Sequence, residues 1–126
     1  MSFESILQTI VDDCGGGLSA ALMGLDGIPI EQVRVSNAVA GRDPLHGDVT
    51  NAGIEFGRIL GDMTKASDSL GTGSLTEAVI SLERVRLIFH HVEDDLMLVL
   101  AITPDGNLGK ARYLIRRSLV ALREEL

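Results

Sequence analysis

The chain has no tryptophan, one tyrosine and three phenylalanines, so aromatic residues make up only 3% of its 126 residues. Few side chains can therefore stack on nucleotide bases, which argues against binding of single-stranded nucleic acid. Basic residues are also in the minority, since 11 Lys and Arg stand against 18 Asp and Glu, for a formal net charge of −7. This charge opposes general attraction to nucleic acid or to anionic membranes. A protein partner or a small ligand is the better expectation.

Cysteine and long apolar runs are also scarce. Cys14 is the only cysteine, so the chain cannot form an internal disulfide bond and gives no sign of an oxidising compartment. We interpret its thiol as passive, because no histidine lies near it in the sequence. No apolar run reaches the roughly 18 residues of a membrane-spanning helix, and the opening MSFESIL lacks the features of a secretory signal. We therefore expect a cytoplasmic protein that does not insert into membranes.

Motifs of catalysis and cofactor binding are missing. The segment PDGNLGKA, residues 104–111, invites comparison with the phosphate-binding pattern GxxxxGK[ST]. Pro104 takes the place of the first glycine, however, and Ala111 replaces the hydroxyl residue that would bind magnesium. The chain also has no GxSxG or HExxH pattern. We expect no catalytic residue and no bound cofactor.

Metal ligands do not cluster in the sequence. His90 and His91 are neighbours on a predicted strand, so their side chains should point to opposite faces of the sheet. The acidic run at residues 93–95 lies in a turn between two predicted strands and lacks the ligand spacing of an EF-hand. We interpret this run as a solvated hairpin tip and predict no metal site.

The apolar residues that are present suffice for one core. They make up 45% of the chain, and we predict a single domain over residues 1–126. Ser2 can cap a first helix that ends at Gly15 to Gly17. The Asp26-Gly27 turn then joins strands at residues 18–24 and 28–35. Pro29 cannot donate a ladder hydrogen bond, so it either places the second strand at a sheet edge or makes the start of that strand irregular.

A loop at residues 36–49 leads to a predicted helix at residues 50–70. Three further strands are predicted at residues 75–83, 85–93 and 96–103. The last of these is apolar on both faces and so belongs in the middle of the sheet. Asp105 or Asn107 can cap a C-terminal helix. The predicted order of elements is therefore α-β-β-α-β-β-β-α.

The middle helix carries glycine at every fourth position, at Gly53, Gly57 and Gly61. Each glycine inside a helix costs roughly 0.8–1 kcal/mol relative to alanine, so close approach of another backbone is the expected compensation. An apolar face beside this stripe should dock the helix on its own domain. Its residues are Ala52, Phe56, Ile59, Leu60, Met63 and Leu70. We interpret the glycine stripe as the contact for a partner helix, and the alternative is that it packs on the chain's own sheet.

The sequence also predicts two further surfaces that could contact a partner. The strand that starts at Leu75 has no proline or lysine to blunt it, and an open edge of this kind invites pairing with another chain. The last helix concentrates basic residues, which suit either an acidic partner or an ordinary solvated face. These basic residues are Lys110, Arg112, Arg116, Arg117 and Arg123.

Several segments resemble the roadblock family of dynein light chains and bacterial regulators. They are the DGIPIE turn and strand, the glycine-containing middle helix and the closing LVLAITPDGNLGKARYLIRRSL. The run TPDGNLGKAR is similar to the strand-to-helix junction of bacterial MglB-type proteins. The resemblance covers nearly the whole chain. It implies an α+β fold whose five-stranded antiparallel sheet has the order 2-1-5-4-3. The middle helix would cover one face and the terminal helices the other.

Family members pair through the middle helix and the third strand, which are the two elements that the sequence pattern also favours. We therefore predict a homodimer whose interface uses both elements. The predicted interface residues are Gly53, Phe56, Gly57, Leu60, Gly61, Leu75, Ala78, Val79, Ile80 and Leu82.

The resemblance also implies a function, namely binding of small Ras-like GTPases and, in some bacterial members, stimulation of their GTP hydrolysis. Such an activator needs no nucleotide site of its own. The predicted partner surface is the exposed face of the middle helix, formed by Ile54, Glu55, Arg58, Asp62 and Lys65. Arg58 could enter a GTPase active site or make a local ion pair. The alternative function is a dimeric adaptor that links motility, transport or signalling proteins without changing nucleotide turnover.

Overall fold

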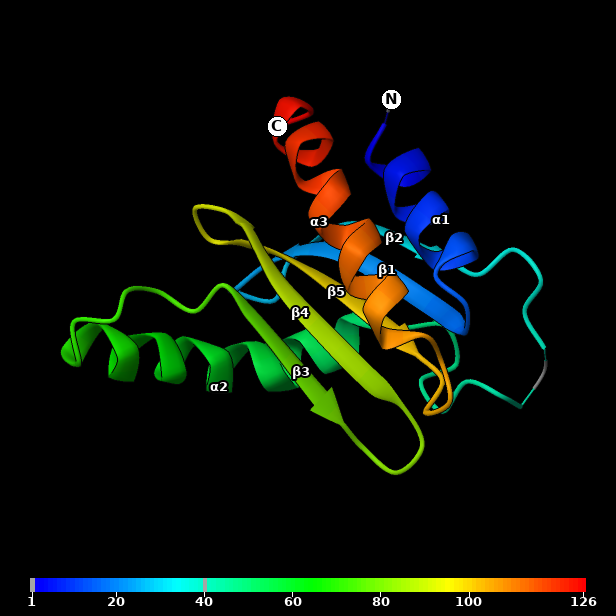
Figure 1. Ribbon diagram of the computed structural model, residues 1–126, viewed down its shortest axis with the longest axis horizontal. Coiled ribbons are helices and arrows are strands. Elements are labelled where there is room, and N and C mark those ends of the chain that lie inside the picture. The colour runs from blue at the N-terminus through cyan, green and yellow to red at the C-terminus, as the bar shows by residue number, and fades with distance from the viewer. Residues whose placement is uncertain (1, 40) are drawn as a thin grey trace.

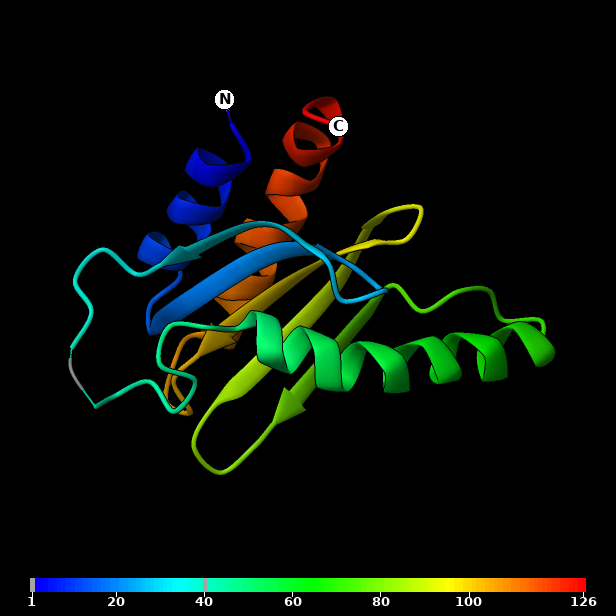
Figure 2. The same ribbon diagram turned by 180° about the vertical axis from the view of Figure 1, so that it is seen from behind.

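A computed structural model describes residues 2–39 and 41–126 (Figure 1). The elements are α1 (Phe3–Asp13), β1 (Gly17–Gly24), β2 (Pro29–Arg34), α2 (Thr50–Ser69), β3 (Glu77–Ser81), β4 (Arg86–Glu93), β5 (Leu96–Ile102) and α3 (Leu108–Glu124). The strands form one antiparallel sheet of order β2-β1-β5-β4-β3. Helices α1 and α3 lie on one face and α2 on the other, as Figure 1 and Figure 2 show. The predicted fold class and element order are thus confirmed.

Local capping explains where the helices begin. Ser2 and Ser5 form a capping box at the start of α1, in which each side chain bonds the other residue's backbone N–H. Asn107 caps α3, because its side-chain oxygen accepts the backbone N–H of Lys110 at 3.0 Å. Of the two caps that the sequence offered for α3, Asn107 is therefore the one used. At α2, Asp48 accepts the backbone N–H of Thr50 at 3.1 Å.

The sheet separates two apolar cores. One core lies between the sheet and the terminal helices and includes Leu7, Ile10, Leu100 and Ile115. The other lies beneath α2 and includes Met23, Leu60, Phe89 and Met97. Every residue of β1 is buried, as is every residue of β5 after its first. The prediction that the last strand lies in the middle of the sheet is therefore confirmed.

The two edges of the sheet differ. Pro29 begins β2 at one edge, as predicted, and Gln8 of α1 donates a hydrogen bond to the carbonyl of Arg34 at that edge. The other edge is β3. The bonds from His91 N–H to the carbonyl of Thr76 and from Leu82 N–H to that of Val85 extend its pairing with β4. By antiparallel alternation, the backbone groups of residues 77, 79 and 81 then face the open edge.

Segment boundaries differ slightly from those predicted. The third strand spans Glu77–Ser81 and not residues 75–83, and the residues paired with β4 run from Glu77 opposite His90 to Ser81 opposite Arg86. The predicted loop at residues 36–49 forms no helix or strand in its described part, and residue 40 lies outside the described residues. Among the helices described, none is long and apolar enough to cross a membrane.

The glycines of α2 do not share one environment. A methyl group at Gly53 would lie 2.1 Å from the sulfur of Met23, and one at Gly57 would lie 3.2 Å from Cε of Met97. Both glycines therefore let the helix backbone approach the chain's own sheet. A methyl group at Gly61 would meet nothing within 4 Å. The reason is its direction, since Gly61 lies three residues after Arg58 and four before Lys65, on the side of α2 that turns away from the sheet.

These environments predict opposite effects of alanine at two glycines. We expect Gly61→Ala to raise the free energy of unfolding by about 0.8 kcal/mol, through helix propensity alone. Gly53→Ala should lower it by about 1 kcal/mol, because overpacking against buried Met23 costs more than the helix gains. Guanidinium unfolding of both variants and the wild type measures the difference. A Gly53→Ala variant as stable as Gly61→Ala would contradict the packing described.

Candidate protein-interaction surface

The exposed side of α2 carries the predicted partner surface. Its five residues are all exposed: Ile54, Glu55, Arg58, Asp62 and Lys65. Within the described part of the chain, the four charged residues among them make no side-chain hydrogen bond or ion pair. They recur at helical spacing, so they share one side of the helix. A side chain at Gly27 would approach Ile54 to 3.3 Å, which places this side next to the turn between β1 and β2.

A second surface of α2 is apolar and exposed. Ile59, Met63 and Leu70 are 50%, 48% and 78% exposed. Helical geometry places them on one stripe, on the flank of α2 opposite Ile54. We call these three residues the α2 stripe. The sequence assigned them to the face that docks the helix on its own domain, and this assignment is wrong.

The reason is the rotation of α2 about its axis. The helix packs on the sheet through Ala52, Gly53, Gly57 and Leu60, all of which are buried. Ala52 and Leu60 thus dock as predicted, but Gly53 and Gly57 dock beside them in place of Ile59, Met63 and Leu70. Small residues let the backbone come close to the sheet, and the larger apolar side chains are left on the flank.

The residues predicted for a dimer interface are spread over several environments. Gly53, Gly57 and Leu60 are buried within the chain, and Phe56 packs against Phe89 with ring centroids 6.1 Å apart. The part-buried apolar residues Leu75, Ala78 and Ile80 pack against the core beneath α2. Three of the predicted residues are open to a partner: Gly61, Val79 and Leu82. Gly61 lies on the charged side of α2, three residues from Arg58 and four from Lys65, and not on the α2 stripe.

Edge strand β3 is tied to α3 by an ion-pair cluster that the sequence analysis missed. The carboxylate of Glu77 accepts hydrogen bonds from Arg112 and, at 3.2 Å, from Arg116. Nε2 of His90 lies 4.0 Å from the same carboxylate. The Glu77 side chain is only 13% exposed. The only sequence signal was an acidic residue in a predicted strand and several basic residues in a predicted helix. This signal is weak, because the ion pair forms only if the strand and the helix pack side by side.

The cluster changes the acidity of Glu77. Burial acts to raise the pKa of this carboxyl, but the hydrogen bonds and positive charges of Arg112 and Arg116 outweigh it and hold the pKa below its ordinary value of 4.5. The ionised form is thus the one that the fold favours.

Other polar residues of the sequence analysis have structural partners. Arg123 donates to the carbonyl of Val92 at 2.7 Å, and the guanidinium of Arg117 lies 5.5 Å from the centre of the Tyr113 ring. Much of the basic face of α3 is therefore engaged within the chain. Cys14 is buried, and this burial raises the pKa of its thiol, which agrees with a passive residue. Among the residues described, no three His, Cys, Asp or Glu side chains are placed to hold a metal ion.

Known structures share this arrangement. The chain is 32% identical to MglC from Myxococcus xanthus, over 100% of both chains, with a TM-score of 0.69. A roadblock/LC7 domain from Streptomyces avermitilis is 14% identical, over 98% of this chain and 97% of that one, with a TM-score of 0.79. The gliding protein MglB from Thermus thermophilus is 20% identical, over 96% of this chain and 85% of that one, also with a TM-score of 0.79.

No protein-family model matches the chain, and no curated protein does so either. The two structures that are 14% and 20% identical to this chain share its fold. MglC is more similar in sequence than these two, and the similarity spans both chains completely. This chain and MglC therefore belong to the same family.

The Glu77 cluster makes stability depend on pH in the acid range. Because the native pKa of Glu77 is lowered, its contribution is fully present above about pH 4.5 and is lost as pH falls through the native pKa. We expect Glu77→Gln to be about 1 kcal/mol less stable than the wild type at pH 7, with a difference that shrinks below pH 4.5. Urea unfolding from pH 7 to pH 3 measures the difference in free energy of unfolding between variant and wild type, with Glu124→Gln as the control. A difference that stays constant over this range would contradict the assignment.

Proposed function

Since the chain belongs to the roadblock/LC7 family, we propose that it is a dimeric, non-catalytic regulator that binds a small Ras-like GTPase through the charged side of α2. Roadblock and MglB-like proteins are regulators rather than catalysts. The observation that carries the proposal is that α2 presents a charged side, whose residues have no partner within the described chain, and beside it an apolar stripe made of other residues.

The α2 stripe and the open edge of β3 support a homodimer. Antiparallel pairing of β3 with β3 of a second copy would satisfy the backbone groups of residues 77, 79 and 81 and extend the sheet. Leu82, which is 43% exposed, follows Ile80 by two residues and so shares the α2 side of the sheet. A second copy that covers Ile59, Met63 and Leu82 would remove an apolar surface from water.

The charged side of α2 suits a GTPase for two reasons. It carries both signs of charge without internal pairing, so a partner can supply the complementary groups. A regulator of this kind needs no nucleotide site, because it can act by holding the switch loops of the GTPase in a productive arrangement. Arg58 is the one arginine on α2, and it is the residue through which the protein would supply charge to a GTPase active site.

The dimer is tested by introducing charge into the α2 stripe. We expect the wild type to sediment as a dimer at about 10 μM and Met63→Glu to sediment as a monomer, because a buried unpaired carboxylate costs several kcal/mol. Val120→Glu changes another exposed apolar residue, on α3, and should leave the dimer intact. A monomeric wild type, or a Met63→Glu variant that still dimerises, would overturn the proposed interface.

GTPase binding is tested on the charged side of α2. We expect Arg58→Ala and Lys65→Ala to weaken binding to a Ras-like GTPase of the source organism by about fivefold or more, while Arg117→Ala on α3 leaves it unchanged. Calorimetry with the GDP form and with a GTP-analogue form measures binding. Single-turnover hydrolysis measures activation, for which a tenfold increase corresponds to about 1.4 kcal/mol.

The two readouts separate the possible functions. Acceleration that Arg58→Ala abolishes identifies an activator in which this arginine acts on the nucleotide. Binding without acceleration identifies an adaptor. Failure to bind any Ras-like GTPase of the organism in either nucleotide state would overturn the proposal.

A further inference from the structure

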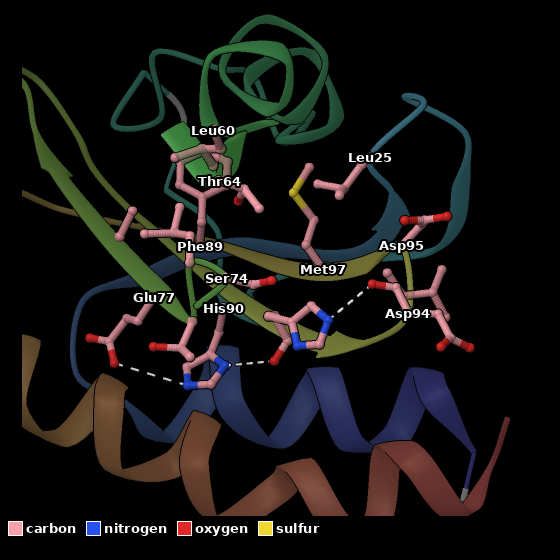
Figure 3. A pocket seen from close by; sticks show the side chains of 15 residues that line it. Leu25, Leu60, Thr64, Ser74, Glu77, Phe89, His90, Asp94, Asp95 and Met97 are labelled. Carbon is pink, nitrogen blue, oxygen red and sulfur yellow. Dashed lines mark hydrogen bonds and ion pairs between the residues drawn. The ribbon is translucent and has the colours of Figure 1, made fainter. Parts of the chain in front are cut away.

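A pocket of about 160 Å³ lies beneath the C-terminal half of α2, at the end of the sheet where β4 turns into β5 (Figure 3). Its floor is apolar and consists of Leu60 from α2, Phe89 from β4 and Met97 from β5, all of which are buried. The pocket exists because α2 leaves the sheet at this point and only a loop, residues 70–76, returns to it.

That loop is held in place. The hydroxyl of Ser67 donates to the carbonyl of Gly73 at 2.6 Å, and the hydroxyl of Thr72 donates to the carbonyl of Ser67 at 2.8 Å. On the opposite side, Nε2 of His91 lies 2.9 Å from the carbonyl oxygen of Asp94. A carbonyl oxygen only accepts, so this ring nitrogen donates and the His91 ring supports the turn. Both walls are thus structured before any ligand arrives.

The rim of the pocket is polar and acidic. Thr64, Ser74 and Thr76 line it, as do Asp94 and Asp95 at the turn between β4 and β5; Figure 3 labels four of these five residues, Thr76 being the exception. None of the 15 lining residues is lysine or arginine.

The other titratable side chains that line the pocket already have hydrogen-bond or ion-pair partners within the chain. The carboxylate of Glu77 is bound by Arg112 and Arg116. His90 bonds the carbonyl of His91 through Nδ1 at 2.8 Å and turns Nε2 toward Glu77. The unpaired charges at the pocket are therefore those of Asp94 and Asp95, and both are negative.

Size and charge together restrict the ligand. Pockets for drug-sized molecules and cofactors have about 300–1,000 Å³, whereas a cavity of about 150 Å³ holds a single benzene ring. A volume of about 160 Å³ thus matches one side chain. The carboxylates disfavour phosphate and other anions, and no trio of metal-binding side chains occurs among the described residues.

We propose that this pocket accepts one lysine or arginine side chain from an exposed basic segment of a partner protein. The methylene groups would lie on Leu60, Phe89 and Met97, and the cationic end would reach Asp94 and Asp95. Long basic side chains combine an apolar stem with a charged end, and this combination complements an apolar floor with an acidic rim.

The pocket lies apart from the α2 stripe. Thr64 borders the pocket, whereas Ile59 and Met63 form the α2 stripe more than a quarter of a turn away around the helix. The inference also holds whether or not the partner is a GTPase, since it concerns only the chemistry of one docked side chain.

A matched pair of peptides tests the proposal. Ac-Gly-Ser-Lys-Ser-Gly-amide and the same peptide with norleucine in place of lysine differ only in the ammonium group. We expect the lysine peptide to cause saturable shifts of the backbone amide signals of Thr64, Asp95 and Met97 in ¹H–¹⁵N spectra of the ¹⁵N-labelled protein. Norleucine should bind at least about threefold more weakly, as exposed charge pairs contribute modestly. An arginine peptide should behave like the lysine peptide.

Variants locate the interaction. Asp94→Asn with Asp95→Asn should remove the preference for lysine over norleucine, and asparagine tolerates the positive φ of 49° at position 94. Glu4→Gln with Glu124→Gln removes the same charge elsewhere and should keep the preference. Thr64→Met fills the pocket and should abolish binding of both peptides.

A salt titration on the wild type provides a test that needs no variant. The lysine preference should disappear at about 1 M NaCl, where the screening length falls to about 3 Å. Equal binding of lysine and norleucine at low salt, a preference that survives in the double asparagine variant, or no saturable shift with either basic peptide would each overturn the proposal.

Discussion

The close packing of α2 on the sheet at Gly53 and Gly57 determines which side chains of that helix are available to partners. A helix turns by about 100° per residue, so once these two glycines face the sheet, the orientation of every other residue follows. The α2 stripe comes to lie on one flank, and the charged side beside it faces away from the sheet. Glycine is costly in a helix, and here the cost is offset by contact with Met23 and Met97.

The sheet supplies a rigid base for this helix. Strands β1 and β5 are covered on both faces, and the strand order makes β2 and β3 the edges. Pro29 and the contact from Gln8 reduce the pairing capacity of β2. Strand β3 keeps its free backbone groups, yet the ion pairs of Glu77 with α3 hold it in a fixed position. An edge that is open and already ordered loses little conformational entropy on pairing.

Local signals in the sequence were enough for most of the fold. Ser2 and Asn107 mark helix starts, Pro29 marks an edge, and the apolar run of β5 marks the centre of the sheet, because each of these depends on neighbouring residues only. The rotation of α2 could not be predicted in this way. Ile59 and Met63 fit an apolar face as well as Leu60 does, and only the packing of Gly53 against Met23 decides between them. The contacts of Glu77 and the pocket beside Thr64 likewise join segments distant in sequence.

The separation of surfaces on α2 bears on how a regulator of this family can work. In the proposed dimer, antiparallel pairing of the two β3 strands places both copies of α2 on the same face of the extended sheet, because the symmetry axis is then perpendicular to it. The apolar stripes are used between the copies, and the charged sides remain exposed. Dimerisation and partner binding therefore do not compete for the same residues. A substitution at Met63 should act on the oligomer first, whereas one at Arg58 acts on the partner directly.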